Sequence, residues 1–195
     1  RSQCKSVREY SLDGFFVIFG SNGFAIMKKS SFLRTLIIVV IIAANIGCDQ
    51  VSKNIARHSL HENETINLVH DHFNLLRVEN TGAFLSMGDS MTAPLRLILL
   101  TILPLILILA ATVFLFWKKR MALYPLIAIC FIVGGGIGNI YDRIIHGSVT
   151  DFMHINFVVF QTGIFNMADV SVMTGMFALL VYFYFVKPKQ KTAAV

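Results

Sequence analysis

Four long apolar stretches dominate the hydrophobic pattern of the chain. They run from about residue 32 to 56, 97 to 117, 121 to 141 and 166 to 186. A helix needs roughly 20 apolar residues to cross the hydrocarbon core of a bilayer, and each stretch reaches about that length. The pattern therefore predicts an all-α membrane protein with four transmembrane helices.

The first 26 residues do not share this pattern. The stretch Ser11–Ala25 is aromatic and contains glycine, and it has no helical period. Met27, followed by two lysines, forms a natural start to the first apolar stretch. We therefore expect residues 1–26 to be a leader or an over-extended N-terminus, and residues 27–195 to form the membrane domain.

The long segment between the first and second apolar stretches has a mixed composition. Thr65–Val69 and Phe73–Val78 are short runs of strand-forming residues. They predict a small extracytoplasmic β-sheet that rests on the membrane surface between helices 1 and 2. A loop or short helix is expected near Ser86–Pro94.

Composition and charge support a membrane protein and argue against a nucleic-acid-binding one. Of the 195 residues, 55% are hydrophobic and only 14% are charged, with a net charge of +6. The basic residues stand at the ends of the apolar stretches, which marks those ends as cytoplasmic and leaves no basic face for a phosphate backbone. Both termini and the turn at 118–120 are therefore expected in the cytoplasm. These basic residues are Lys28, Lys29, Lys118, Lys119, Arg120, Lys187, Lys189 and Lys191.

Four aspartates lie at the predicted outer ends of the helices or in the loops beside them. They are Asp49, Asp142, Asp151 and Asp169. A carboxylate in or beside the bilayer is costly and indicates a functional site by default. Because the four come from different helix ends yet lie at one depth, we expect them to gather at one site.

The four aspartates divide into two kinds. Asp49 and Asp142 have basic neighbours, Lys53 and Arg143, and are interpreted as members of fixed ion pairs. The other two have no lysine or arginine within four positions. Two carboxylates held close together share a proton, so one acts as an acid and the other as a base at the same pH. This is an arrangement that activates water against a peptide bond.

Other polar groups have weaker patterns. Asn80 and Asn166 can orient a substrate backbone or merely brace a loop. The glycines of Gly134–Gly138 lack the Lys-Ser/Thr of a phosphate loop and are interpreted as points of close helix contact. The histidine pairs lack the helical glutamate motif of a zinc site, so no metal or other cofactor is expected. These histidines are His58, His61, His70 and His72.

Two other functions remain open from the residues alone. In a proton-coupled transporter the same carboxylates would form a relay, which requires a polar path across the bilayer. In a structural membrane subunit they would only join helices. The uncharged second and third stretches, with the acids at one face, favour an enzyme.

Five short motifs occur in order along the chain, each at a fixed place relative to the apolar stretches. Together they resemble the bacterial lipoprotein signal peptidase family, signal peptidase II, from about Met27 to Val186. The motifs are Asp49-Gln50-Val51-Ser52-Lys53, Asn80-Thr81-Gly82-Ala83-Phe84, Gly134-Gly135 with Gly138-Asn139-Ile140-Tyr141-Asp142-Arg143, Val149-Thr150-Asp151-Phe152, and Phe165-Asn166-Met167-Ala168-Asp169.

The resemblance implies an aspartic endopeptidase of the bacterial cytoplasmic (inner) membrane, with its active site near the outer face. Such enzymes remove the signal peptide from a diacylglyceryl-modified prolipoprotein, just before the lipidated cysteine, and are inhibited by globomycin. Asp151 and Asp169 match the catalytic pair. Substrate-binding or supporting roles are implied for Asp49, Lys53, Asn80, Gly82, Asn139, Asp142, Arg143, Asn166 and Ala168.

Overall fold

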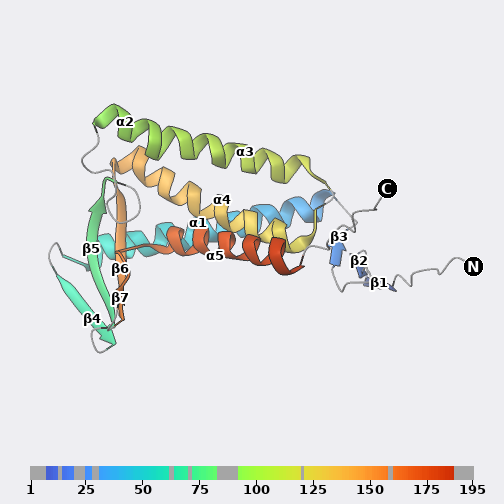
Figure 1. The fold of residues 1–195 in the computed structure, drawn as a ribbon, viewed down its shortest axis with the longest axis horizontal. Coiled ribbons are helices and arrows are strands. Elements are labelled where there is room, and N and C mark those ends of the chain that lie inside the picture. Colours follow the sequence, from blue (N-terminus) through green and yellow to red (C-terminus); the bar gives the residue numbers. More distant parts are fainter. Residues whose placement is uncertain are drawn as a thin grey trace, which may run out of the picture.

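A computed structural model describes residues 8–12, 15–19, 25–27, 31–61, 64–69, 72–82, 92–119, 121–157 and 160–186. The helices lie side by side, and a small sheet crosses one end of them (Figure 1). In chain order the elements are β1 (Arg8–Leu12), β2 (Phe15–Phe19), β3 (Ala25–Met27), α1 (Ser31–Ser59), β4 (Thr65–Val69), β5 (Phe73–Asn80), α2 (Ala93–Leu97), η2 (Ile98–Ile102), α3 (Leu103–Trp117), α4 (Leu123–His146), β6 (Val149–Phe157), β7 (Phe160–Gln161), α5 (Met167–Val181) and η3 (Tyr182–Val186).

The prediction of four transmembrane helices is confirmed. Four helical segments are long and apolar enough to cross a membrane: Phe32–Ser59, Ala93–Trp117, Leu123–His146 and Met167–Val186. The second is continuous through α2, η2 and α3, so it begins four residues earlier than predicted. The chain is therefore a multi-pass membrane protein.

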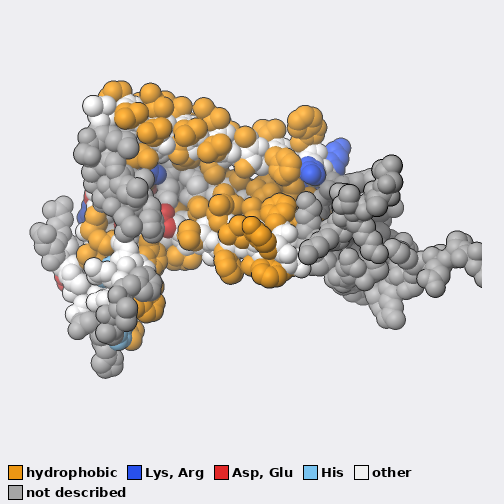
Figure 2. Space-filling model, viewed as in Figure 1, with side chains coloured by type: hydrophobic (Ala, Val, Ile, Leu, Met, Phe, Trp, Pro, Cys, Tyr) orange, Lys and Arg blue, Asp and Glu red, His pale blue; other side chains and the backbone are white. Residues whose placement is uncertain are grey.

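The outer surface of the helices is apolar. Leu115 is the one buried residue along α2, η2 and α3, and large side chains such as Ile106 and Leu107 are more than half exposed. Hydrophobic side chains cover the helices in the space-filling view (Figure 2). A soluble helix would hide such a face, so this surface is suited to lipid.

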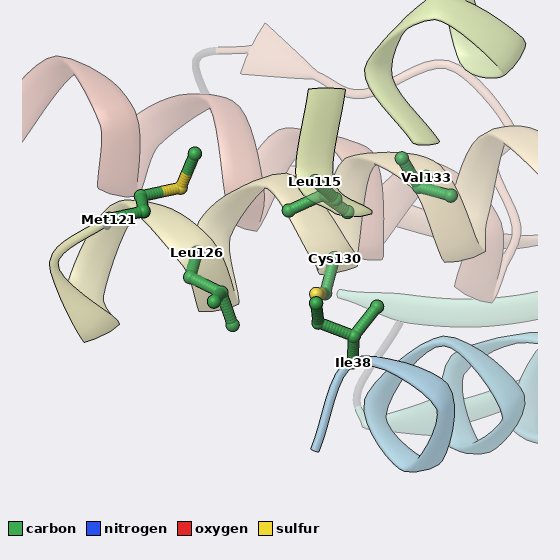
Figure 3. Close-up of a cluster of buried hydrophobic side chains, with 6 residues drawn as sticks. All are labelled: Ile38, Leu115, Met121, Leu126, Cys130 and Val133. Atoms are coloured by element: carbon green, nitrogen blue, oxygen red, sulfur yellow. The ribbon is translucent and has the colours of Figure 1, made fainter. Parts of the chain in front are cut away.

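The helices are joined by an apolar cluster on the side of the molecule away from the four-stranded sheet. It is built from α1, α3, α4 and the turn before α4 (Figure 3). Beside it, the buried Arg34 of α1 donates hydrogen bonds to the carbonyl oxygens of Leu115 and Lys118. These carbonyl groups at the C-terminal end of α3 have no partner within the helix, so Arg34 supplies one. The cluster consists of Ile38, Leu115, Met121, Leu126, Cys130 and Val133.

The sheet contains more strands than the sequence analysis placed in it. Its order is β4-β5-β6-β7, and all neighbouring strands are antiparallel. The predicted strands β4 and β5 are present, but β6 and β7 come from the segment between α4 and α5, in which no strand was predicted. Strand β6 pairs with β5 across a long sequence separation, and local patterns do not reveal such a partner.

Glycines set the position of α4. Gly147, with φ of +74°, ends the helix in the left-handed conformation and turns the chain into β6. A Cβ atom on Gly135 would clash with the carbonyl oxygen of Ala168, and one on Gly138 would clash with Oδ2 of Asp49. The predicted close helix contact at this glycine run is therefore confirmed.

Helix lengths place the acidic residues at one depth. At 1.5 Å per residue, Asp49 lies about 27 Å from the start of α1 and Asp142 about 28 Å from the start of α4. Asp169 stands in the first turn of α5. These positions fall near the edge of a hydrocarbon core about 30 Å thick, at the end of the helices that carries the sheet.

Two predictions concern parts of the chain that the structure describes only in part. Strands β1, β2 and β3 form a separate antiparallel sheet, and the division of the chain at residue 27 stays a prediction. Of the loop or short helix expected near Ser86–Pro94, residues 86–91 lie outside the described residues, and Ala93 begins α2.

Candidate active site

Asn166 connects the two aspartates that were predicted to form a pair. Its side-chain Nδ2 donates to Oδ1 of Asp151 at 2.6 Å. Its side-chain oxygen accepts from the backbone N–H of Asp169 at 3.0 Å, and its own N–H donates to Oδ2 of Asp169 at 3.1 Å. The reciprocal capping box of Asn166 and Asp169 starts α5. The fully buried Asn166 thereby bonds both carboxylates, Asp151 through its side chain and Asp169 through its backbone N–H.

Asp151 is held on its other side by strand β5. Val78 pairs with Asp151 and Asn80 with Val149, so Asn80 lies beside the aspartate on the same face of the sheet. Its Nδ2 donates to Oδ2 of Asp151 at 2.9 Å, and its oxygen accepts from the N–H of Gly82. Both oxygens of Asp151 thus accept an amide hydrogen bond.

A buried ion-pair network lies behind Asp169. Nζ of Lys53 is 2.8 Å from Oδ2 of Asp49 and 2.9 Å from Oδ2 of Asp142, and all three side chains are fully buried. The same ammonium donates to Oδ1 of Asn139, whose Nδ2 donates to Oδ1 of Asp169 at 2.8 Å. The network therefore orients the amide that holds one aspartate of the pair.

Asp49 also anchors α5 to α1. Its Oδ1 accepts from the backbone N–H of the fully buried Ala168 at 2.8 Å, one residue before Asp169. An orphan N–H at a helix N-terminus is thereby satisfied by a carboxylate, which the positive end of the helix dipole also favours. The predicted Asp49–Lys53 pair is present, and it has this second role.

The prediction of an ion pair between Asp142 and Arg143 is wrong. Asp142 pairs with Lys53 and Arg57 instead. The Arg143 guanidinium donates to the carbonyl oxygens of Gly82 and Asn139. Successive side chains of a helix point about 100° apart, so adjacent positions in α4 face different partners. Arg143 thus links α4 to the turn after β5.

Sequence reasoning missed a second polar network, on the opposite face of the sheet from Asp151. Nε of Arg57 donates to Oγ1 of Thr150 at 2.7 Å, and that hydroxyl bonds the Glu79 carboxylate at 3.0 Å. Glu79 also accepts from Ser148 at 2.8 Å. A signal was available for Arg57, because it stands four residues after Lys53 on the same helix face.

The environment of Asp151 changes its proton affinity. Burial raises the pKa of Asp151 to about 6, and the negative charge of Asp169 acts in the same direction. The hydrogen bonds from Asn80 and Asn166 stabilise the ionised form and oppose this shift. A carboxyl group with such a pKa exchanges protons near neutral pH, as a general acid or base requires.

A cavity of about 460 Å³ borders this aspartate. It is open to solvent over β5 and β6, and the segment after β7 forms its other side. Red acidic atoms are visible where the sheet meets the helices (Figure 2). The residues that line the cavity are Val78, Asn80, Asp151, His154, Gln161, Thr162, Gly163 and Ile164.

Two of the histidines that were considered as zinc ligands, His58 and His72, bond backbone groups away from this site. His58 bonds the carbonyl oxygen of Asn54 one turn earlier in α1, and His72 bonds that of Asn156 at the far end of the sheet. Within the described ranges, no three of the side chains that commonly bind metals gather in one place. His70 lies outside the described residues.

The comparisons with known proteins agree on one family. A protein-family model described as "Signal peptidase (SPase) II" matches residues 17–185. The chain is 31% identical over 151 residues to a lipoprotein signal peptidase of Pelodictyon phaeoclathratiforme, covering 73% of this chain and 86% of the relative. It is 34% identical over 158 residues to one of Borreliella burgdorferi, covering 78% and 92%.

Solved structures share the fold. A bacterial membrane enzyme solved by the in meso method at 2.3 Å superposes with a TM-score of 0.70 and 23% identity, over 81% of this chain and 93% of the other. A second, at 1.9 Å, gives a TM-score of 0.68 over 76% of this chain and 92% of the other.

Proposed function

The chain belongs to the signal peptidase II family, and we propose that Asp151 and Asp169 are the catalytic pair with which it works. It is a membrane protease that removes signal peptides from prolipoproteins. The observation that carries the proposal is the buried residue Asn166, whose side-chain amide donates to the carboxylate of Asp151 and whose backbone N–H donates to that of Asp169. Asp151 also borders the cavity of about 460 Å³.

The proposed reaction is a general acid–base hydrolysis. The pair holds one proton between its two carboxyl groups. The ionised carboxylate removes a proton from water as the water oxygen attacks the peptide carbonyl carbon, and the protonated one donates to the carbonyl oxygen. The C–N bond then breaks as one carboxyl group of the pair gives its proton to the leaving nitrogen and the pair takes back a proton from a hydroxyl of the tetrahedral intermediate, which restores its single shared proton.

The remaining predicted residues have supporting roles in this proposal. Asn80 and Asn166 hold Asp151, while Asn139 holds Asp169. Arg143 and Gly82 shape the turn that follows β5 beside the pair. Asp49, Lys53, Asp142 and Ala168 fix the helices that carry these groups.

The substrate is proposed to be a diacylglyceryl-modified prolipoprotein, cut just before the lipidated cysteine. The apolar helix surface supports this, because it lets the acyl chains stay in the bilayer while the bond reaches the pair. Globomycin-type cyclic peptides are proposed to bind at the same pair. The direct test is cleavage by the purified protein in detergent of a lipid-modified prolipoprotein and of the same polypeptide without the lipid. Cleavage of neither, with the protein folded, would contradict the proposal.

The pH profile of kcat/KM provides a second test. As the pH rises through about 6, Asp151 loses the proton that the pair shares, so activity is expected to fall on this alkaline limb. Asn80→Ala removes a hydrogen bond that lowers the pKa of Asp151, so the limb is expected to move to higher pH. The apparent pKa values belong to the pair. A limb that stays in place or moves to lower pH would contradict the assignment.

The orientation in the membrane is also a proposal. We place the site at the outer face of the cytoplasmic membrane, with both termini inside, because Lys118 and Lys119 lie at the opposite end of the helices from the pair. Single cysteines at Glu64 and Lys119, in a chain with Cys4, Cys48 and Cys130 replaced, are expected to react with an impermeant thiol reagent from opposite sides. Reaction of both from one side would reject this topology.

A proton-coupled transporter receives no support. Arg96 is the one charged residue in the second membrane-capable helix, and the acids of the other helices gather at one end. The described residues therefore contain no chain of ionisable groups from one face to the other.

A further inference from the structure

The cavity beside Asp151 extends well beyond the catalytic pair. Asp151 and Asn80 form one edge of it, and the other edge is the segment from Gln161 to Ile164, which connects β7 to the capping box of α5. A volume of about 460 Å³ is large enough for several amino-acid residues. A chain lying in the cavity is therefore within a few residues of any bond held at the pair.

The position of the sheet decides which side of that bond enters the cavity. The sheet crosses the end of the helices, beyond their apolar surface (Figure 1). An apolar signal peptide gains most by staying among lipid-facing helices, and acyl chains do the same. The polar polypeptide that follows the cleaved bond has to leave the bilayer, and the route out passes over the sheet.

The cavity wall is mixed: Val78 and Ile164 are apolar, and polar side chains stand between them. Thr162 is already engaged, since its hydroxyl accepts from the N–H of Ile155 and donates to the carbonyl oxygen of that residue. The side chains of His154 and Gln161, by contrast, make no hydrogen bond to the part of the chain that the structure describes. Each carries both a donor and an acceptor, so each is able to bond a substrate without losing an existing partner.

We propose that this cavity binds the first residues of the lipoprotein after the lipidated cysteine, and that His154 and Gln161 select polar side chains there. The inference rests on the proposed function and adds a specificity site to it. Neutral hydrogen bonds of this kind change kcat/KM by about 3- to 10-fold. The diacylglyceryl group is placed outside the cavity, because its acyl chains gain more among the lipid-facing helices.

The test uses lipid-modified prolipoproteins that are identical through the cysteine and carry serine, aspartate or leucine at the second and third positions after it. The wild-type protein is expected to cleave the polar substrates about 3- to 10-fold faster than the leucine one. His154→Leu and Gln161→Leu are expected to reduce this ratio to below twofold, because cleavage of the polar substrates falls more than cleavage of the leucine one. His58→Leu, at an exposed position on α1, is the matched control and keeps the full ratio.

The outcomes separate the two proposals. If the wild-type protein cleaves none of the substrates, the proposed function fails. If it cleaves all of them at one rate, or if both variants keep the wild-type ratio, the cavity proposal fails and the function stands. A photoreactive residue at the second position after the cysteine gives an independent measurement on the wild-type fold. Crosslinks to His154 or to residues 161–164 are expected, and crosslinks only to the apolar helices would overturn the proposal.

Discussion

Replacing Asp151 or Asp169 by asparagine is expected to lower kcat for cleavage of a lipid-modified prolipoprotein by about 10²–10⁴-fold. Asparagine keeps the size of the side chain but neither releases nor takes up a proton. The double variant is expected to cost little more than either single one, because groups that act as a unit are non-additive. The measurement is single-turnover cleavage in detergent, with Glu64→Gln as an exposed carboxylate control.

Folding has to be checked in the same variants. Both oxygens of Asp151 accept amide hydrogen bonds, so an asparagine amide group would face one of the donors, Asn80 or Asn166. Replacing a buried carboxylate by a neutral amide also removes a desolvation cost, so the melting temperature is expected to change little. Cleavage at the wild-type rate by either folded variant would reject the aspartic mechanism.

Lys53→Met is expected to destabilise the protein by about 3–5 kcal/mol. The variant leaves Asp49 and Asp142 buried with their shared partner removed, and breaking a buried pair from one side costs more than replacing the whole pair. Activity is expected to fall as well, because Lys53 orients Asn139, which in turn holds Asp169. The measurement is equilibrium unfolding in detergent micelles alongside the cleavage rate.

A compensating variant makes this prediction sharper. Adding Asp49→Asn and Asp142→Asn to Lys53→Met removes the uncompensated charges, so part of the lost stability is expected to return. Lys119→Met, at an exposed turn, is the matched lysine control and is expected to leave stability unchanged. If Lys53→Met unfolds like the control, the buried network does not hold the helices together.

The membrane helices and the aspartate pair could be predicted from the sequence because both depend on local signals. Hydrophobic length alone defines the helices. Asp151 and Asp169 stand out because they lack nearby basic partners, and the capping box that connects them begins with Asn166, itself a predicted residue.

Long-range and orientational features could not be predicted in the same way. Strand β6 depends on pairing with β5 about seventy residues earlier, as in the Val78–Asp151 pair. The Asp142–Arg143 assignment failed because adjacency in sequence was treated as proximity, whereas a helix turns neighbours apart. Glu79 and Thr150 became visible as partners only when the sheet register was known.

The i,i+4 spacing of Asp49 and Lys53 has a consequence for biogenesis. Among the four membrane helices, α1 is synthesised first. It carries both Asp49 and Lys53, so the charges of these two residues can neutralise each other as the helix enters the bilayer. Helix α4 arrives later with Asp142, whose basic neighbour points elsewhere, and it finds Lys53 already in place. The order of synthesis therefore places the basic partner Lys53 ahead of Asp142, the acid on α4 that it pairs with.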